Sequence, residues 1–267
     1  GGSFILASCN DFLDREPLDS VTPDNFFFTE NDLAAYAVKH YNFTTHEGFN
    51  AGIWRNDNAT DNQAATDYDK KWIPGQWKVP EAYDNPASND PWYFSAIREA
   101  NYFLETVVPR FEKGEIEGSE TNIKHYIGEM YFLRAKNYLS KLETFGDFPI
   151  IKNTLPDESA SLIQASKREP RHKVARFILE DLDLAIGLLT NTISGGKNRI
   201  TQNAALLLKS RAALYEASWL TYHKGTALVP GGPGWPGKAE DIADFNIDTE
   251  IAFFLKEAKA AAKEVIG

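Results

Sequence analysis

The chain has 267 residues, of which 43% are apolar and 25% are charged, a balance typical of a folded globular protein. Its 38 acidic and 28 basic residues give a net charge of −10, and the basic residues are scattered rather than gathered into a stripe. Such a chain would repel a phosphate backbone, so we exclude nucleic acid as a partner. Every apolar run is far shorter than the roughly 20 residues of a membrane-spanning helix, so no segment is expected to cross a bilayer.

The only cysteine of the chain, Cys9, follows a short apolar run and a pair of small residues, Ala7 and Ser8. A single thiol excludes an internal disulfide. The pattern is typical of the end of a bacterial lipoprotein signal peptide, after which the cysteine carries lipid. We therefore predict that residues 1–8 are the remnant of a signal and that the membrane is contacted only through a lipid anchor on Cys9. The alternative is an incidental cysteine in a leader.

The helical signal begins at about residue 91. For residues 9–90 we expect one or two helices and irregular loops, and for residues 91–267 a helical region. In that region apolar residues recur with a period of 3.6, and capping residues and glycines mark several helix ends. These signals predict helices at 91–113, 122–145, 170–189, 201–223 and 248–265.

Helices of about 20 residues, with small and large residues alternating on the packed faces, are typical of tetratricopeptide-like hairpins. The predicted fold class is therefore all-α, with tetratricopeptide-like hairpins and irregular loops. The helix pairs do not repeat at a strict period. An irregular helical bundle needs the same amphipathic pattern and stays open as the alternative.

Residues 54–77 combine indole rings with side chains that form paired hydrogen bonds. Sugars present apolar C–H faces that pack on aromatic rings, and hydroxyl pairs that bind carboxylate and amide groups. Two of the tryptophans in this segment lie on a predicted turn, where ligand contacts are common. The alternative is that the tryptophans pack against the helices and the acids face water. We predict that a saccharide binds to Trp72, Trp77, Asn56, Asp57 and Asp61.

The other tryptophans are less informative. Trp92 begins a helix and Trp219 lies on a packed helix, so both are predicted to be structural. The glycine-rich run 231–237 contains prolines, which lack the amide donors of a phosphate cradle, so it is predicted to be a surface loop. For Trp235 in that loop, ligand contact and a structural role both stay open.

The sequence contains no motif that predicts catalysis, a cofactor or a metal. The five histidines lack the spacing of a zinc site, and the serine-hydrolase and phosphate-loop motifs are absent. Scattered histidines of this kind are predicted to be surface or helix-packing residues. Counted as an EF-hand from Asp57, position 6 is Asn62 where glycine is needed, and position 12 is Tyr68 where glutamate is needed. A calcium loop is therefore not predicted.

Several separated motifs occur in a fixed order along the chain. The strongest are Gly128-Glu129-Met130-Tyr131-Phe132-Leu133-Arg134-Ala135 and Phe145-Gly146-Asp147-Phe148-Pro149-Ile150. Others are Cys9-Asn10-Asp11-Phe12-Leu13-Asp14, Glu30-Asn31-Asp32-Leu33, Ile97-Arg98-Glu99-Ala100-Asn101 and Arg199-Ile200-Thr201. In this order the motifs resemble the N-terminal half of the SusD/RagB family, the surface glycan-binding lipoproteins of Bacteroidetes.

That resemblance implies a tetratricopeptide-like fold in a lipid-anchored protein at the cell surface, on the outer membrane. It implies capture of an oligo- or polysaccharide and its delivery to a SusC-like TonB-dependent transporter, with no enzyme activity and no cofactor. Members of the family are generally much longer, so we expect the C-terminal half of the family fold to be missing from these residues. A helical protein-interaction scaffold that binds no sugar is the alternative.

Overall fold

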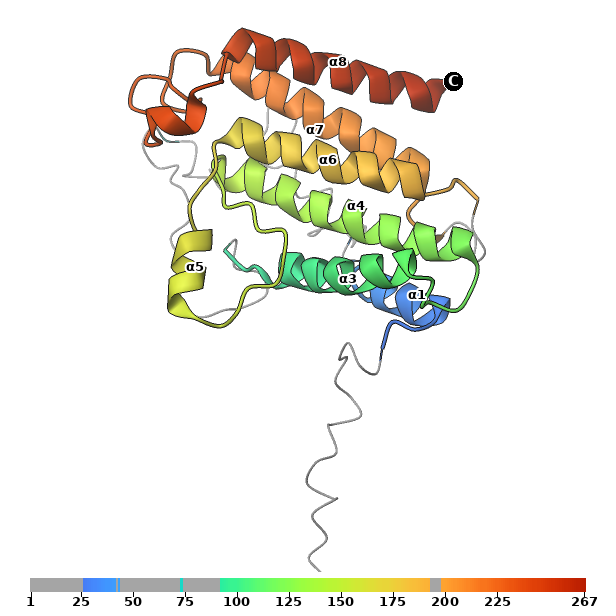
Figure 1. The fold of residues 1–267 in the computed structure, drawn as a ribbon. Coiled ribbons are helices and arrows are strands. Elements are labelled where there is room, and N and C mark those ends of the chain that lie inside the picture. Colours follow the sequence, from blue (N-terminus) through green and yellow to red (C-terminus); the bar gives the residue numbers. More distant parts are fainter. Residues whose placement is uncertain (1–25, 42, 44–72, 74–91, 193–197) are drawn as a thin grey trace, which may run out of the picture.

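The computed structural model describes residues 26–41, 43, 73, 92–192 and 198–267, and these residues form a stack of helices (Figure 1). In the described residues there is no named strand, and two isolated bridges join loops. The predicted all-α class is therefore confirmed, whereas the division of the chain at residue 90 stays a prediction. The elements in chain order are α1 (Glu30–Lys39), α3 (Ser95–Glu112), α4 (Glu120–Phe145), α5 (Ser159–Ala165), α6 (Arg171–Leu188), α7 (Gln202–Tyr222), the 3-10 helix η4 (Ala239–Ile242) and α8 (Ile247–Ile266).

The long helices α3, α4, α6, α7 and α8 lie side by side in chain order and alternate in direction, and α1 packs on α4 (Figure 1). Helix α4 is central because it contacts α1, α3, α6 and α7. A helix with neighbours on several sides is buried around most of its circumference. Accordingly, the six consecutive residues from His125 to Met130 are all buried.

Residues at the helix ends satisfy backbone groups that the helices leave unpaired. The side chain of Thr201 accepts a hydrogen bond from the Ala204 N–H, as predicted from the sequence. Gly146 ends α4 with a φ of 73°, a conformation that favours glycine. At α1, Thr29 and Asp32 cap each other's backbone N–H groups.

The clearest differences from the sequence-based expectation are the start of one helix and the presence of another. Helix α3 begins at Ser95 rather than at Pro91. The reason is aromatic packing: the rings of Trp92 and Phe94 lie against Phe145 and Phe148, with centroids 4.0 and 5.3 Å apart, and this holds the chain before α3 in place. Helix α5 was not expected at all. It has seven residues, fewer than a sequence window needs to reveal a helical period, and none of them is buried.

Two further tryptophans are fixed by hydrogen bonds. Trp219 packs against the core and donates its Nε1–H to the carbonyl oxygen of Leu228 at 2.9 Å, in agreement with a structural role. Trp235 donates its Nε1–H to Oδ2 of Asp147 at 2.8 Å. Most residues of the 231–237 loop are exposed, as predicted, but Trp235 ties the loop to the α4–α6 connection.

Buried ion pairs join neighbouring helices. Arg134 on α4 donates two hydrogen bonds to Asp181 on α6, both at 2.7 Å, and a third to Oδ1 of Asn101 on α3 at 2.9 Å. Arg171 on α6 donates to both carboxylate oxygens of Glu216 on α7, at 2.9 to 3.1 Å. All five side chains are buried. Because a buried charge is unfavourable without its partner, these pairs select which helix faces meet.

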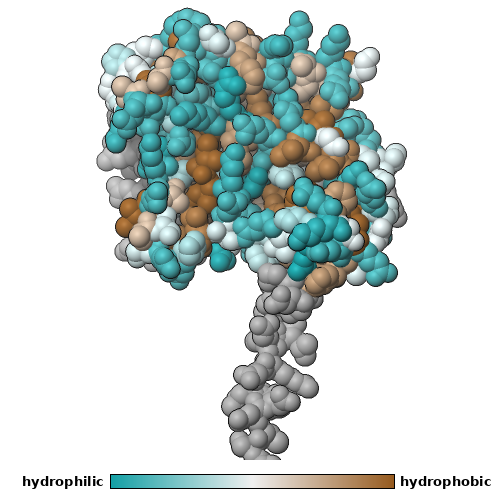
Figure 2. All heavy atoms as spheres, in the orientation of Figure 1, coloured by the Kyte–Doolittle hydropathy of each residue, from teal (hydrophilic) through white to brown (hydrophobic). Residues whose placement is uncertain are grey.

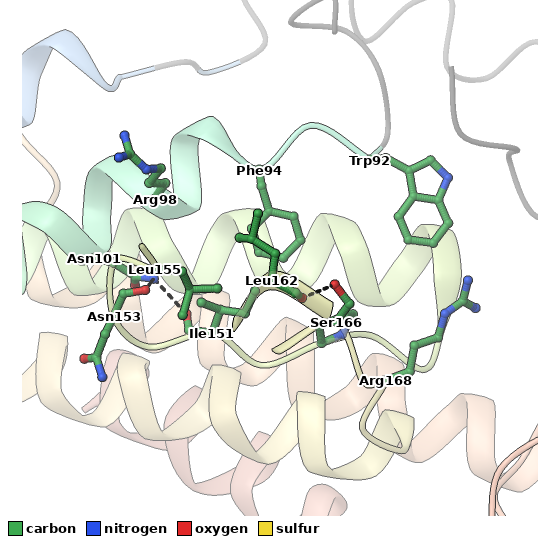
Figure 3. A pocket seen from close by; sticks show the side chains of 11 residues that line it. Trp92, Phe94, Arg98, Asn101, Ile151, Asn153, Leu155, Leu162, Ser166 and Arg168 are labelled. Carbon is green, nitrogen blue, oxygen red and sulfur yellow. Dashed lines mark hydrogen bonds between the residues drawn. The ribbon is translucent and has the colours of Figure 1, made fainter. Parts of the chain in front are cut away.

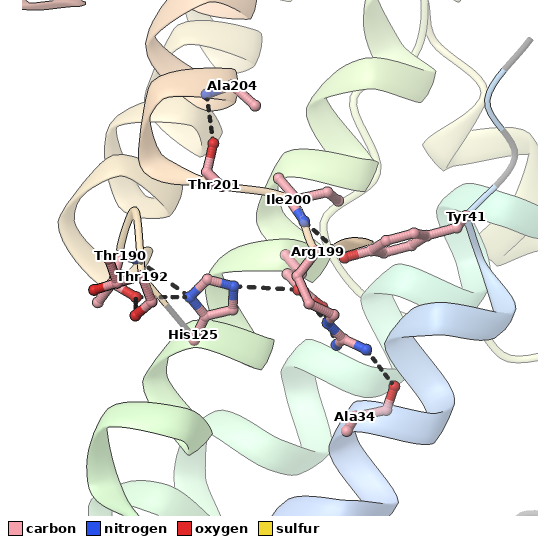
Figure 4. A network of polar contacts seen from close by, with 10 residues as sticks. Ala34, Tyr41, His125, Thr190, Thr192, Arg199, Ile200, Thr201 and Ala204 are labelled. Atoms are coloured by element: carbon pink, nitrogen blue, oxygen red, sulfur yellow. Dashed lines mark hydrogen bonds and ion pairs between the residues drawn. The ribbon is translucent and has the colours of Figure 1, made fainter. Parts of the chain in front are cut away.

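Arg199, in the loop before α7, connects segments that are far apart in the chain (Figure 4). Its guanidinium donates to Glu129 on α4 from Nε at 2.8 Å, and to the carbonyl oxygen of Ala34 on α1 at 3.3 Å. The next residue, Ile200, donates its backbone N–H to the hydroxyl of Tyr41 at 3.0 Å. Glu129 is fully buried, so Arg199 supplies the positive charge that compensates for its burial.

The face of the molecule in Figure 2 carries mostly hydrophilic side chains, with hydrophobic strips between them. Among the described residues, no helix combines the length and the apolar character that crossing a membrane requires.

Candidate functional site

The residues predicted from the sequence to bind a saccharide lie outside the part of the chain that the structure describes. This applies to Trp72, Trp77, Asn56, Asp57 and Asp61, and also to the predicted lipidation site Cys9. Their roles stay predictions.

The described residues form a pocket of about 470 Å³ between the start of α3, the loop after α4 and helix α5 (Figure 3). This volume lies within the roughly 300–1,000 Å³ of small-molecule sites. Its lining combines aromatic, aliphatic, amide, hydroxyl and guanidinium groups. The lining residues are Trp92, Phe94, Arg98, Asn101, Pro149, Ile151, Asn153, Leu155, Leu162, Ser166 and Arg168.

An aromatic cluster around Phe148 supports one side of the pocket. The Phe148 ring is fully buried, and its centroid lies 5.3 Å from that of Phe94, with the two rings almost parallel. It also lies 5.3 Å from Phe145, 6.0 Å from Trp92 and 6.3 Å from Tyr138. Because Gly146 ends α4 two residues earlier, the chain turns and brings Phe148 beneath the start of α3. The cluster therefore holds Trp92 and Phe94 at the pocket wall.

The loop after α4 is held by hydrogen bonds to helix side chains. Asn101 on α3 donates to the carbonyl oxygens of Ile151 and Asn153, at 2.8 and 3.3 Å. The Tyr138 hydroxyl on α4 accepts from the Ile151 N–H at 2.8 Å and donates to the Ile151 carbonyl at 3.2 Å. Burial raises the pKa of Tyr138 to about 12, so the hydroxyl keeps the proton that it donates. Asn101 and Tyr138 thus hold in place the loop that forms one wall of the pocket.

Helix α5 covers another side of the pocket and is weakly packed. None of its residues is buried, and Leu162, which lines the pocket, is 40% exposed. The Ser166 hydroxyl donates to the Leu162 carbonyl at 2.6 Å, within the same turn. This side of the pocket is therefore bounded by exposed side chains.

Across the described residues, His, Cys, Asp and Glu side chains do not gather in groups of three or more that could hold a metal ion. Sequence reasoning missed this pocket because its lining comes from three separate segments, although the aromatic residues before α3 and after Gly146 were visible as a signal.

Residues 11–214 match the model of the SusD-like family described as "Starch-binding associating with outer membrane". SusD-like protein P2 of Formosa agariphila is 27% identical over 258 residues, which cover 94% of this chain and 45% of the relative. A solved SusD-like protein from Bacteroides fragilis is 25% identical, with a TM-score of 0.56 over 77% of this chain and 38% of the other. A second solved protein from Bacteroides fragilis, a SusD-like carbohydrate-binding protein, is 18% identical, with a TM-score of 0.54 over 74% of this chain and 40% of the other.

The chain thus spans less than half the length of these relatives. The likeness to the two solved structures extends over most of this chain, in agreement with its stack of helices. Because the family model matches residues 11–214, which is more than half of the sequence, the chain belongs to the SusD-like family.

Proposed function

We propose that this chain is the helical part of a cell-surface lipoprotein that captures an oligo- or polysaccharide. It delivers the sugar, chemically unchanged, to a SusC-like TonB-dependent transporter in the outer membrane. The family match over residues 11–214 carries this proposal. The pocket beside α3 supports it, because aromatic and aliphatic walls next to N–H donors suit the two kinds of surface that a sugar presents.

The proposed contacts are the five residues of the 54–77 segment singled out by the sequence. Indole rings pack on sugar C–H faces, while amide and carboxylate groups hold hydroxyl pairs. A polar ligand gives up nearly as many hydrogen bonds to water as it gains. We therefore expect each site to bind with a Kd of about 10 μM to 1 mM. Repeated sites along a polymer raise the apparent affinity.

The double variant Trp72→Ala/Trp77→Ala should bind polysaccharide at least about tenfold more weakly, because it loses two stacking platforms of about 1 kcal/mol each. Affinity gel electrophoresis of the whole chain against a panel of polysaccharides measures this loss. Tyr222→Ala is the matched control, since this ring is 84% exposed at the end of α7 and lies outside the proposed site.

Unchanged retention of the double variant would contradict the proposed contacts. If binding to the transporter then depended on the helix faces, the scaffold alternative would be favoured. Incubation of the protein with each retained polymer should release no reducing ends. Their release would contradict capture without chemical change.

The transporter and the anchor are tested in the native outer membrane. The protein extracted in mild detergent should carry lipid on Cys9 and bring with it a TonB-dependent transporter in equal amount, as measured by mass spectrometry. Cys9→Ala should leave the protein without lipid and detached from the membrane. Absence of the transporter in several mild detergents, with lipid present on Cys9, would refute delivery and leave a free-standing surface binder.

A further inference from the structure

The pocket beside α3 has an unusual charge balance for this chain. The chain carries a net charge of −10, yet none of the residues that line this pocket is acidic. Two of them, Arg98 and Arg168, are arginines. Elsewhere, Arg134, Arg171, Arg176 and Arg199 pair with carboxylates. Neither pocket arginine forms an ion pair within the described part of the chain, so the pocket is a local positive site on an acidic protein.

Neighbouring acids in the chain do not neutralise the two arginines by direct pairing. Glu99, next to Arg98, lies 3.3 Å from Nδ1 of His40. Glu169, next to Arg168, lies 3.5 Å from the ammonium of Lys173. Asp147 lies near enough to Arg168 for the two charges to interact, but its carboxylate accepts hydrogen bonds from the Arg171 N–H and the Trp235 Nε1–H. Among the described residues, both guanidinium groups are therefore available to a ligand.

Arg168 stacks on the ring of Trp92, and this contact orients its guanidinium to bind an anion. Its guanidinium carbon lies 5.1 Å from the centroid of the Trp92 ring, which itself packs on Phe145. A guanidinium held over an aromatic face keeps its N–H donors free at the edge of its plane. That edge matches two oxygens of a carboxylate or sulfate group, which a guanidinium binds through two parallel hydrogen bonds.

The two arginines stand at opposite ends of the pocket, with Phe94 and Leu162 between them (Figure 3). Phe94 is stacked on Phe148 and forms part of the pocket wall. Aliphatic side chains of the loop after α4 form the adjoining part of the same wall. A small inorganic anion would make no use of this apolar middle. A sugar ring would, because its C–H face can pack there while acidic substituents reach the ends.

We propose that this pocket binds an acidic saccharide, with its carboxylate or sulfate groups at Arg168 and Arg98 and a sugar ring against the apolar wall between them. This inference rests on the proposed function and adds the class of sugar. Because this chain carries a net charge of −10, which disfavours polyanions, retention of an acidic polymer by the chain requires a local site of this kind.

Affinity electrophoresis of the whole chain tests the proposal with matched pairs of polymers. Polygalacturonate and alginate are each compared with their carboxyl-reduced forms, and a sulfated galactan is compared with its desulfated form. We expect at least one acidic polymer to retain the protein about tenfold more strongly than its neutral form, and raised salt to weaken that retention. The polymer pair in which the acidic form is retained more strongly shows whether the bound group is a carboxylate or a sulfate.

Arg98→Met and Arg168→Met should each weaken this retention about tenfold, and the double variant should abolish it. Both side chains are exposed, so the variants should fold normally, as checked by circular dichroism. Arg211→Met is the control, because it removes the same charge from an exposed position on α7 outside the pocket.

Each remaining outcome is decisive. Equal retention by the acidic and neutral forms, or retention by neutral polymers alone, overturns the acidic specificity but leaves saccharide capture standing. Acidic retention that survives in both arginine variants overturns the assignment to this pocket. Retention by no polymer at all refutes the proposed function and this inference together.

Discussion

Replacing Asp181 with alanine is expected to lower the free energy of unfolding by about 3–5 kcal/mol, because it leaves the charge of Arg134 buried without its partner. Asp181 is 1% exposed and accepts two hydrogen bonds from Arg134 at 2.7 Å. Among the described residues, the acceptors that remain to the guanidinium in the variant are Oδ1 of Asn101 and the carbonyl oxygen of Lys152. Chemical denaturation of the variant and the parent chain at neutral pH measures the loss.

The adjacent residue offers a matched control. Glu180 also pairs with a cation, Lys152, at 3.6 Å, but both side chains are more than half exposed. Glu180→Ala should therefore change stability by less than about 1 kcal/mol. The double variant Arg134→Met/Asp181→Leu should recover much of the loss, since apolar groups can replace a buried pair. If Asp181→Ala cost no more than Glu180→Ala, the buried pair would not contribute to stability as described.

Phe148→Ala is expected to be destabilising by about 3–5 kcal/mol, because it removes a fully buried ring and leaves a cavity. The same change removes the support of Phe94, so the pocket wall should lose its shape and saccharide retention should fall. Thermal and chemical denaturation measure the first effect, and affinity electrophoresis below the melting temperature measures the second.

Phe148→Leu serves as the conservative comparison. It keeps most of the volume and the apolar character, so we expect a loss of less than about 2 kcal/mol. Retention should be reduced in Phe148→Ala and largely kept in Phe148→Leu. A loss of stability without any effect on retention would show that saccharide binding does not depend on the aromatic cluster.

The long helices were predictable because their apolar residues repeat every 3.6 positions and local signals mark their ends. Thr201 and Gly146 act as the caps that the sequence indicates. The start of α3 was misplaced because the packing of Trp92 and Phe94 on rings from α4 and the loop that follows it overrides the local start signal. Local signals describe a helix end well only where no distant side chain competes with them.

The buried ion pairs and the pocket could not be predicted from the sequence, because the residues that form them are distant from one another in the chain. Arg134 lies among the apolar positions of its helix, and a charge in such a stripe indicates a buried partner. Periodicity does not identify that partner, which is 47 positions away. The pocket likewise joins the start of α3, the loop after α4 and helix α5, whose seven residues are too few to reveal a helical period in the sequence. The predicted contacts in the 54–77 segment remain predictions.

The contact between Arg199 and Glu129 also constrains the order in which the chain can fold during synthesis. Glu129 is fully buried in the stack, and its arginine is made 70 residues later. At the pace of a ribosome this delay is roughly 4 to 14 s. Until then, packing around Glu129 would bury a carboxylate without that partner. The helices before Arg199 should therefore stay loosely associated on the ribosome and lock together late, as one cooperative unit, rather than folding one after another from the N-terminus.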